Sequence, residues 1–161
     1  MNARPPLSGF TLIELVVTVA IVALLSTLAF PLAEVVVKRN KEQELRLALR
    51  EIRSALDAYK QAVDEGRVEH SAEKSAYPES LKVLVDGVPD MSSPDRKKMI
   101  YFLRRIPRDP MFIDASRPAD ETWGKRSYES SYDAPEEGAD VYDVYSLAQG
   151  TGLNGIPYRD W

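Results

Sequence analysis

The chain has 161 residues, of which 21 are lysine or arginine and 25 are aspartate or glutamate, for a formal net charge of −4. A nucleic-acid-binding protein is expected to concentrate basic residues on one face, so this balance argues against that class. The absence of cysteine excludes disulfides and cysteine-based metal centres. Without roughly the first forty residues, about 120 remain, which is enough for one small hydrophobic core.

An apolar run extends from Phe10 to Val37 and carries one charge near each end, Glu14 and Glu34. The nineteen residues from Leu15 to Ala33 include no charge. A helix of that length covers about 30 Å, the thickness of a bilayer's hydrocarbon core. Soluble helices rarely need such a long face that is apolar all round. We therefore expect residues 10–37 to span a membrane.

Residues 1–9 (MNARPPLSG) form a short polar leader with one basic residue, Arg4. In a secretory signal peptide the apolar region precedes the cleavage site. Here a small residue, Gly9, precedes the apolar run, so cleavage between Gly9 and Phe10 would leave that run on the mature protein. Such a cut would also place Glu14 four residues after a new, positively charged α-amino group.

The sequence Gly9-Phe10-Thr11-Leu12-Ile13-Glu14, followed by an apolar run that contains Pro31, resembles the class III signal of type IV pilins and type II secretion pseudopilins. The resemblance implies that a prepilin peptidase cleaves after Gly9 and methylates the new N-terminal Phe10. The alternative is a plain signal anchor that contains this hexapeptide by chance. The common register of glycine, phenylalanine, glutamate, apolar length and proline favours the pilin-like signal.

Glu14 is informative because a carboxylate inside a bilayer costs several kcal/mol unless it is paired. As a monomer, the chain could extend Glu14 to the headgroups, about one turn away. In a helical assembly, the α-amino group of one subunit could neutralise Glu14 of its neighbour. The resemblance implies this pairing during subunit addition. Pro31 is the second expected assembly residue, because it removes a helical hydrogen bond and predicts a kink or local unwinding.

The charges that flank the apolar run give conflicting signals about orientation. Lys38, Arg39 and Lys41 follow the run, whereas only Arg4 and the initial amine precede it. The positive-inside rule alone would leave the C-terminal part in the cytoplasm. The resemblance implies the opposite: a single pass through the bacterial inner membrane, with a cytoplasmic leader and a periplasmic C-terminal part. We follow the resemblance, because the motif must face its peptidase on the cytoplasmic side.

A second apolar pattern continues the helix. Apolar residues recur four and three positions apart, as on one helical face: Leu45, Leu49, Ile52, Leu56, Tyr59 and Val63. Gly66 breaks this pattern. We expect one helix from about Phe10 to Glu65, roughly 80 Å long. Its second half is expected to pack on a globular head, the alternative being a coiled coil.

The remaining residues predict a loop-rich head. Leu81, Leu84 and Val85 share the face of a short helix, and residues 101–110 form a short extended piece. Residues 86–95, 111–122 and 130–139 are expected to form turns or loops. The best strand candidates are Trp123–Tyr128 and Val141–Leu147, which are rich in aromatic and β-branched residues. We assign no role to His70, the single histidine.

The predicted fold class is α+β and type IV pilin-like, with a long N-terminal helix packed on a small antiparallel sheet. The predicted parts are a leader (1–9), a transmembrane or filament-core helix (10–37), an amphipathic continuation (38–65) and a periplasmic globular head (66–161).

The head extends the resemblance to the major pseudopilin (G subunit) of type II secretion. The residues that carry it are, in order, Tyr77-Pro78, Leu81, Leu84, Leu103–Pro110, Trp123-Gly124, Val144–Leu147 and Trp161. Two departures stand out. Residues 111–122 intervene where the family runs Asp-Pro directly into Trp-Gly. The C-terminal loop also lacks the aspartates with which the family binds calcium.

Calcium requires six to eight oxygen ligands, several of them carboxylates. The C-terminal loop offers Asp160, the amide oxygens of Gln149 and Asn154, and backbone carbonyls. We therefore expect no cofactor, with Ca²⁺ at these three residues as the alternative. The acidic residues Asp133, Glu136, Glu137, Asp140 and Asp143 are interpreted as a solvated face and not as a metal site.

Nothing in the sequence supports catalysis, because no G-x-S-x-G, P-loop or H-E-x-x-H pattern occurs. The favoured interpretation is a structural subunit of a type II secretion-like filament that helps to export folded proteins across the outer membrane. Its implied partners are other copies of itself in a helical homopolymer, the prepilin peptidase, minor pseudopilins and the inner-membrane assembly platform.

The alternatives are a type IV pilus subunit, major or minor, and a membrane-anchored periplasmic binding protein that uses its head, including residues 111–122. Adhesive pilins commonly carry a C-terminal disulfide, and the absence of cysteine therefore favours secretion.

Overall fold

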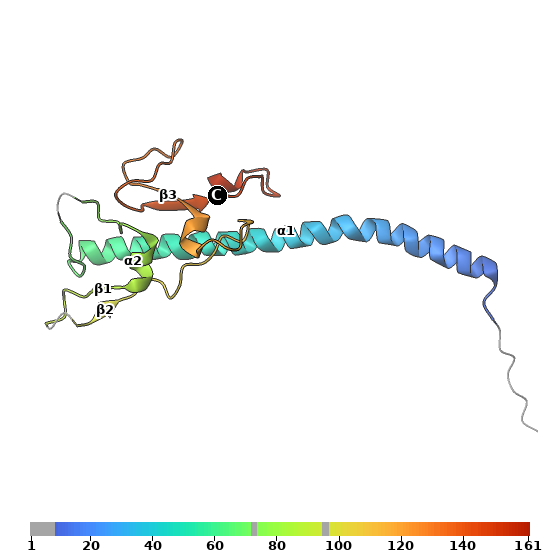
Figure 1. Cartoon of the computed structure of the whole chain (residues 1–161), viewed down its shortest axis with the longest axis horizontal. Helices are drawn as coiled ribbons and strands as arrows, with labels where there is room; N and C mark the ends of the chain where they lie inside the picture. The colour runs from blue at the N-terminus through green and yellow to red at the C-terminus, as the bar shows by residue number, and fades with distance from the viewer. Residues whose placement is uncertain (1–8, 72–73, 95–96) are drawn as a thin grey trace, which may run out of the picture. The chain divides into compact units, whose positions relative to one another are not determined.

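The computed structural model describes residues 9–71, 74–94 and 97–161, and for residues 28–31 it describes the backbone alone. The chain separates into two compact units, Met1–Arg39 and Asn40–Trp161. The second unit holds the head together with the later half of the long helix (Figure 1). The fold is α+β and matches the predicted pilin-like class.

The long helix α1 runs from Leu12 to Asp64, close to the predicted bounds. It ends in a Schellman motif, in which the amide of Gly66 donates to the carbonyl of Val63 at 2.8 Å and the amide of Arg67 donates to the carbonyl of Ala62 at 2.8 Å. Gly66 has a φ of +69°, a conformation that glycine adopts without strain. The glycine that broke the sequence pattern is therefore the residue that ends the helix.

A kink or local unwinding was predicted at Pro31. The backbone of α1 stays helical there, so the unwinding does not occur, and the kink stays a prediction. An interior proline removes one i to i−4 hydrogen bond and crowds the preceding turn, which a helix can accommodate by bending. The helix can therefore continue past the proline.

The predicted apolar stripe forms the core of the second unit. Leu45, Ile52 and Leu56 are at most 1% exposed, and they pack with buried residues of the head: Leu81, Leu84, Leu103, Trp123 and Val144. Tyr59, also in the stripe, is half-buried and packs edge-on against Phe102, with ring centroids 5.3 Å apart. The stripe therefore serves intramolecular packing, as predicted.

Helix α2 (Leu81–Asp86) confirms the predicted short helix, with Leu81 and Leu84 buried. The predicted strands are confirmed as β3 (Trp123–Arg126) and β4 (Asp143–Ser146), which pair antiparallel with Trp123 opposite Ser146. A Cβ atom at Gly124 would overlap the ring of Tyr145 on the neighbouring strand. A larger residue at this position would have to displace the Tyr145 ring.

The second sheet was not predicted. It pairs β1 (Val88–Pro89) with β2 (Met99–Ile100) antiparallel, where residues 86–95 were expected to form only turns. Each strand is two residues long, too short for an alternating pattern to appear. Residues 101–110 form no strand. The amides of Phe102 and Leu103 instead donate to the carbonyl of Leu84 at 3.0 and 2.9 Å.

Two 3-10 helices lie within segments predicted as loops. They are η1 (Ala119–Thr122) and η2 (Tyr158–Asp160).

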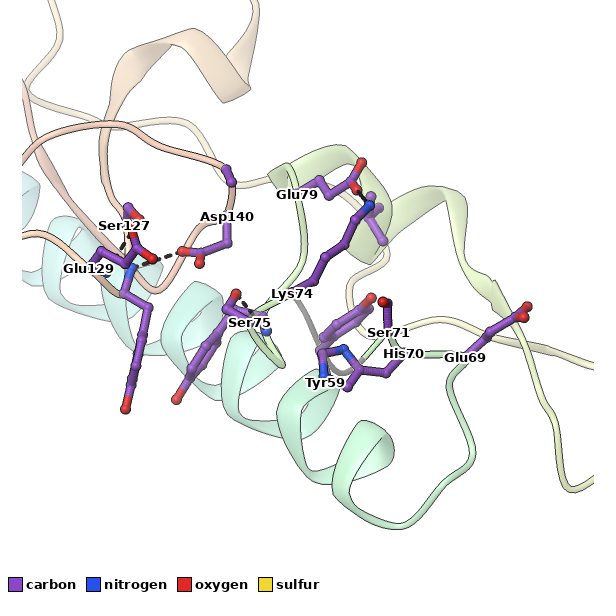
Figure 2. Close-up of a pocket in the computed structure, with 14 residues that line it drawn as sticks. Tyr59, Glu69, His70, Ser71, Lys74, Ser75, Glu79, Ser127, Glu129 and Asp140 are labelled. Atoms are coloured by element: carbon purple, nitrogen blue, oxygen red, sulfur yellow. Dashed lines mark hydrogen bonds and ion pairs between the residues drawn. The ribbon is translucent and has the colours of Figure 1, made fainter.

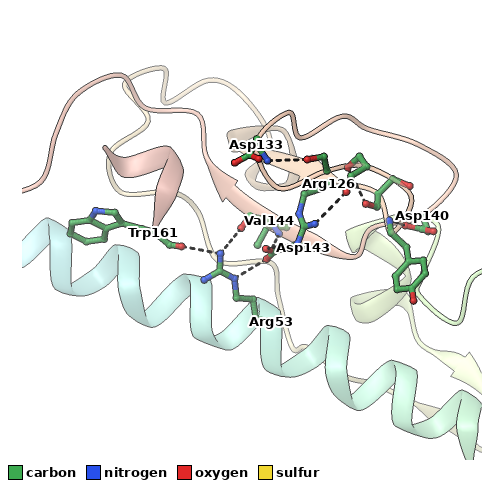
Figure 3. A network of polar contacts seen from close by, with 11 residues as sticks. Arg53, Arg126, Asp133, Asp140, Asp143, Val144 and Trp161 are labelled. Carbon is green, nitrogen blue, oxygen red and sulfur yellow. Dashed lines mark hydrogen bonds and ion pairs between the residues drawn. The ribbon is translucent and has the colours of Figure 1, made fainter. Parts of the chain in front are cut away.

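Arg53 of α1 connects the helix to the head (Figure 3). Its Nε donates to Asp143 Oδ1 at 2.8 Å, and its Nη2 donates to the main-chain oxygens of Val144 at 3.1 Å and Trp161 at 3.0 Å. Arg126 also pairs with Asp143, at 3.5 Å. The prediction of a solvated acidic face is therefore wrong for Asp143, and also for Asp140, which is buried and accepts from the amide of Tyr128 at 2.9 Å.

Glu42 is a second connection between α1 and the head. Its carboxylate is buried and accepts hydrogen bonds from the amide of Leu153 at 2.8 Å and the hydroxyl of Tyr158 at 3.1 Å. Burial, followed by the hydrogen bond to Glu42, raises the pKa of Tyr158 to about 12. Glu42 thereby holds the C-terminal loop on the helix.

Candidate processing and assembly site

The first part of α1 is exposed wherever its side chains are described. Every described side chain from Gly9 to Val37 is exposed, and an 18-residue window of the helix has a mean hydropathy of 2.5 with nothing buried. Leaving apolar area in water costs about 25 cal/mol per Å². A continuous surface of this kind requires lipid or other protein chains as its partner. In length and composition the helix suits a membrane span.

Thr11 and Glu14 form a reciprocal cap at the start of this helix. The amide and the hydroxyl of Thr11 each donate to Glu14 Oε2 at 2.9 Å, and the amide of Glu14 donates to Thr11 Oγ1 at 3.3 Å. This is a capping box, T-x-x-E, in which each side chain satisfies an amide that has no partner within the helix. It explains why α1 begins at Leu12 and not at Phe10 as predicted.

The capping box also stabilises the charged form of the Glu14 carboxylate. Positive helix-end dipoles and two hydrogen bonds stabilise the negative charge at this position. The same carboxylate is exposed, so a cation from another molecule can reach it. Within a single chain, Thr11 thus supplies Glu14 with hydrogen-bond partners without burying it.

Gly9 and Phe10 lie just before the cap, and both are exposed, Phe10 at 87%. A Cβ atom built on Gly9 would meet no atom within 4 Å. The fold of this chain therefore does not require glycine at residue 9. Any requirement for glycine there would have to come from another molecule that binds this segment. The leader residues 1–8 and the side chain of Pro31 lie outside the description.

The residues considered for calcium are not gathered into a site for a cation. Asn154 Oδ1 accepts from the amide of Ile156 at 3.1 Å, and Asp160 lies 3.5 Å from the guanidinium of Arg159. Asp160 and Asn154 also line a hollow with three arginines, and Gln149 does not line it. Across the described ranges, no three His, Cys, Asp or Glu side chains form a group that could hold a metal. This donor set does not fit calcium, and binding there stays an untested prediction.

A hollow of about 730 Å³ lies between the end of α1 and the loops that follow it (Figure 2). Tyr59, Tyr77 and Tyr128 contribute to its walls, and an ion pair of 2.6 Å between Lys74 and Glu79 crosses its edge. His70 also lines it, but no hydrogen bond within the described ranges joins this imidazole to a serine or a carboxylate. Among its described residues, the hollow therefore shows no nucleophile hydrogen-bonded to His70.

Three functional residues escaped the sequence prediction. The T-x-x-E signal of the capping box was readable, so Thr11 could have been found. Glu42 and Arg53 had no comparable signal, because their partners lie about a hundred residues away, from 90 to 116 positions along the chain.

Residues 8–30 match a family model, that of the prokaryotic N-terminal methylation motif. The chain thus carries a type IV pilin-like signal at the position where the sequence predicted one, and this signal indicates a pilin-like or pseudopilin-like subunit. Such a motif on an exposed apolar helix also supports membrane anchoring. No curated protein and no solved structure matches the chain.

Proposed function

We propose that the protein is a structural pseudopilin of a type II secretion-like filament, which helps to export folded proteins across the outer membrane. The observation that carries this proposal is the methylation motif at residues 8–30, which lies where the described side chains from Phe10 to Val37 are all exposed. Such a surface suits two environments in turn, lipid before assembly and neighbouring copies of the helix afterwards.

In this proposal a prepilin peptidase cleaves between Gly9 and Phe10 and methylates the new amine of Phe10. The lack of any steric need for glycine at residue 9 supports a role in recognition by the peptidase. The leader faces the cytoplasm and residues 40–161 lie in the periplasm. The minor pseudopilins and the inner-membrane platform are the expected partners of assembly.

Assembly then exchanges the partners of Glu14. In the single chain its carboxylate bonds to Thr11. In the filament the α-amino group of a neighbouring Phe10 takes over, which compensates the charge when lipid or protein surrounds it. A desolvated carboxylate without such a cation would oppose assembly by several kcal/mol.

A type IV pilus subunit has the same N-terminal signal, so the choice between the two depends on the head. The absence of cysteine excludes the C-terminal disulfide that is common in adhesive pilins, and this supports the secretion assignment.

The test is deletion of the gene in the native host, with complementation by the full chain. A secretion pseudopilin predicts that exported folded enzymes accumulate in the periplasm while surface pili persist. Loss of surface pili with normal export would overturn the secretion assignment in favour of a pilus subunit. A topology reporter fused after Trp161 should be active only in the periplasm, and cytoplasmic activity would contradict the orientation.

A further inference from the structure

A hollow of about 480 Å³ lies between α1 and the C-terminal loop, within the unit Asn40–Trp161. Leu49, Ile156 and Trp161 contribute apolar walls, and Arg46 and Arg50 contribute guanidinium groups. We call it the arginine hollow, defined by these five residues. Arg53 also lines it, but that side chain is already bonded to Asp143 and the head.

The two guanidinium groups of the arginine hollow pair with no carboxylate of the described residues. Arg46 lies over the ring of Trp161, 4.4 Å from its centroid, and the Nε of Arg50 donates to the carbonyl of Arg46 at 3.3 Å. Among the described residues neither arginine forms an ion pair, and both are exposed. Asp160, the one acidic residue that lines the hollow, pairs instead with Arg159. The hollow thus combines an apolar wall with two uncompensated positive charges.

The loop of residues 130–139 has the complementary chemistry. It presents Tyr132, which is 65% exposed, beside the exposed carboxylates of Asp133, Glu136 and Glu137. Within the described part of the chain, only Glu137 of these three acids has an ion pair, a distant one of 3.8 Å to Lys125. We call this segment the acidic loop. Figure 3 shows Asp133 in this loop, on the same side of α1 as Arg53 and Trp161.

The two patches are neighbours on one side of the head. Tyr132 lines a small groove together with Arg53, Asp160 and Trp161, and the last three also line the arginine hollow. The acidic loop nevertheless makes no ion pair with Arg46 or Arg50 of its own chain. The charges of the two patches are therefore both available to another molecule.

We propose that the arginine hollow of one copy binds the acidic loop of a second copy of this chain. Tyr132 then lies against the apolar wall that includes Trp161, and the carboxylates of Asp133 and Glu136 face Arg46 and Arg50. This inference rests on the proposed function, because it specifies how the heads of adjacent filament subunits meet.

Two physical consequences follow from this arrangement. Where each copy offers its arginine hollow to one neighbour and its acidic loop to another, the interface is heterologous, and repetition gives an open polymer. Charges at such an exposed interface favour the correct register and disfavour wrong ones more than they add affinity. The head contact would therefore set how subunits align, while the apolar helices supply most of the buried area.

Charge reversal in the full chain tests the contact. Arg50→Glu should reduce polymer yield about tenfold, because it places like charges opposite each other, and Glu136→Arg should do the same. The double variant should recover most of the loss, since it restores opposite charges. Arg104→Glu is the matched control, because Arg104 is exposed and does not line the hollow, and it should leave the yield unchanged. Unchanged melting of each variant head would verify folding.

Cross-linking gives an independent readout, since the chain has no native cysteine. Co-expressed Arg50→Cys and Glu136→Cys chains should form a covalent dimer under oxidation, and a chain carrying both should form a ladder. The control pairs Arg50→Cys with Glu79→Cys, because Glu79 is exposed and lies outside both patches. This pair should form no covalent dimer.

The contact would be overturned if either charge-reversal variant polymerised as well as wild type and the Arg50→Cys and Glu136→Cys chains did not cross-link. The proposed function would still stand in that case. Absence of any wild-type polymer would overturn both.

Discussion

The two halves of α1 show how one helix can have two kinds of partner. Ile21 and Ile52 belong to the same helix, yet Ile21 is 52% exposed and Ile52 is fully buried. Around Ile21 the helix is apolar on every side, which no single head could cover. Around Ile52 a narrow apolar stripe matches the surface of the head. The width of the apolar face therefore separates a helix that folds against its own chain from one that needs lipid or other copies.

The largest effect is expected when the leader before the first half of α1 cannot be cleaved, because the proposed assembly follows that cleavage. Gly9→Val should abolish cleavage at Gly9–Phe10 while the head folds normally, because a side chain at residue 9 meets nothing in this chain. Immunoblots of membrane fractions would detect only the longer precursor. Ser8→Ala, one residue earlier, is the matched control and should be processed. Normal cleavage of Gly9→Val would show that the peptidase does not recognise this glycine.

Glu14→Ala probes the same half after processing. Removal of one partner of a desolvated ion pair costs about 3 kcal/mol or more, and each 1.4 kcal/mol corresponds to about a factor of ten. We expect filament yield to fall about a hundredfold, with cleavage and membrane insertion intact. Glu34→Ala, the acidic residue at the other end of the apolar run, should assemble normally. Filaments of Glu14→Ala in wild-type amounts would contradict the pairing.

Matched isoleucine truncations test the comparison directly. Ile52→Ala should destabilise the head by about 3 kcal/mol, since it leaves a cavity in the core. Ile21→Ala should change head stability by less than about 0.5 kcal/mol, because its side chain is exposed. Unfolding of the full chain in detergent can be followed by the fluorescence of the buried Trp123. Equal losses in the two variants would remove the distinction between the halves.

The smallest expected effect is a loss of stability of the head at acidic pH. The Ser92 hydroxyl, then Arg67, lowers the pKa of the buried Asp90 from 3.8 to about 2. A lowered pKa means that its stabilisation is present above the ordinary pKa and is lost as the pH falls from 3.8 towards 2. Burial raises the pKa of Asp109, which acts in the opposite direction.

The contribution of Asp90 to stability is therefore measured by comparing the wild type with Asp90→Asn, since both contain Asp109. Asp90→Asn should be less stable than wild type at neutral pH, and the two should converge near pH 2. A difference that does not depend on pH would contradict the assignment.

The sequence predicted those parts of the fold whose signals are local. The apolar run, the stripe and Gly66 predicted α1 within two residues at its start and one at its end. Aromatic and β-branched clusters predicted β3 and β4. The pairing of β1 with β2 was missed, because two-residue strands owe their conformation to tertiary contacts and not to propensity.

The candidate site shows the same division. Gly9, Phe10 and Glu14 belong to one short motif and could be named from sequence, and Thr11 was readable as half of a capping box. The partner of Arg53 could not be named, because Asp143 lies 90 positions further along the chain. Asp140 and Asp143 were predicted to belong to a solvated acidic face, and only the fold separates these two from their exposed neighbours.

The central claim is that the first half of α1 is processed and then becomes the core of a filament. Mass spectrometry of filaments purified from cells that express the full chain tests it most directly. The account predicts subunits that begin at Phe10 and carry a methyl group on the α-amino nitrogen. Filaments built from subunits that still begin at Met1 would contradict it.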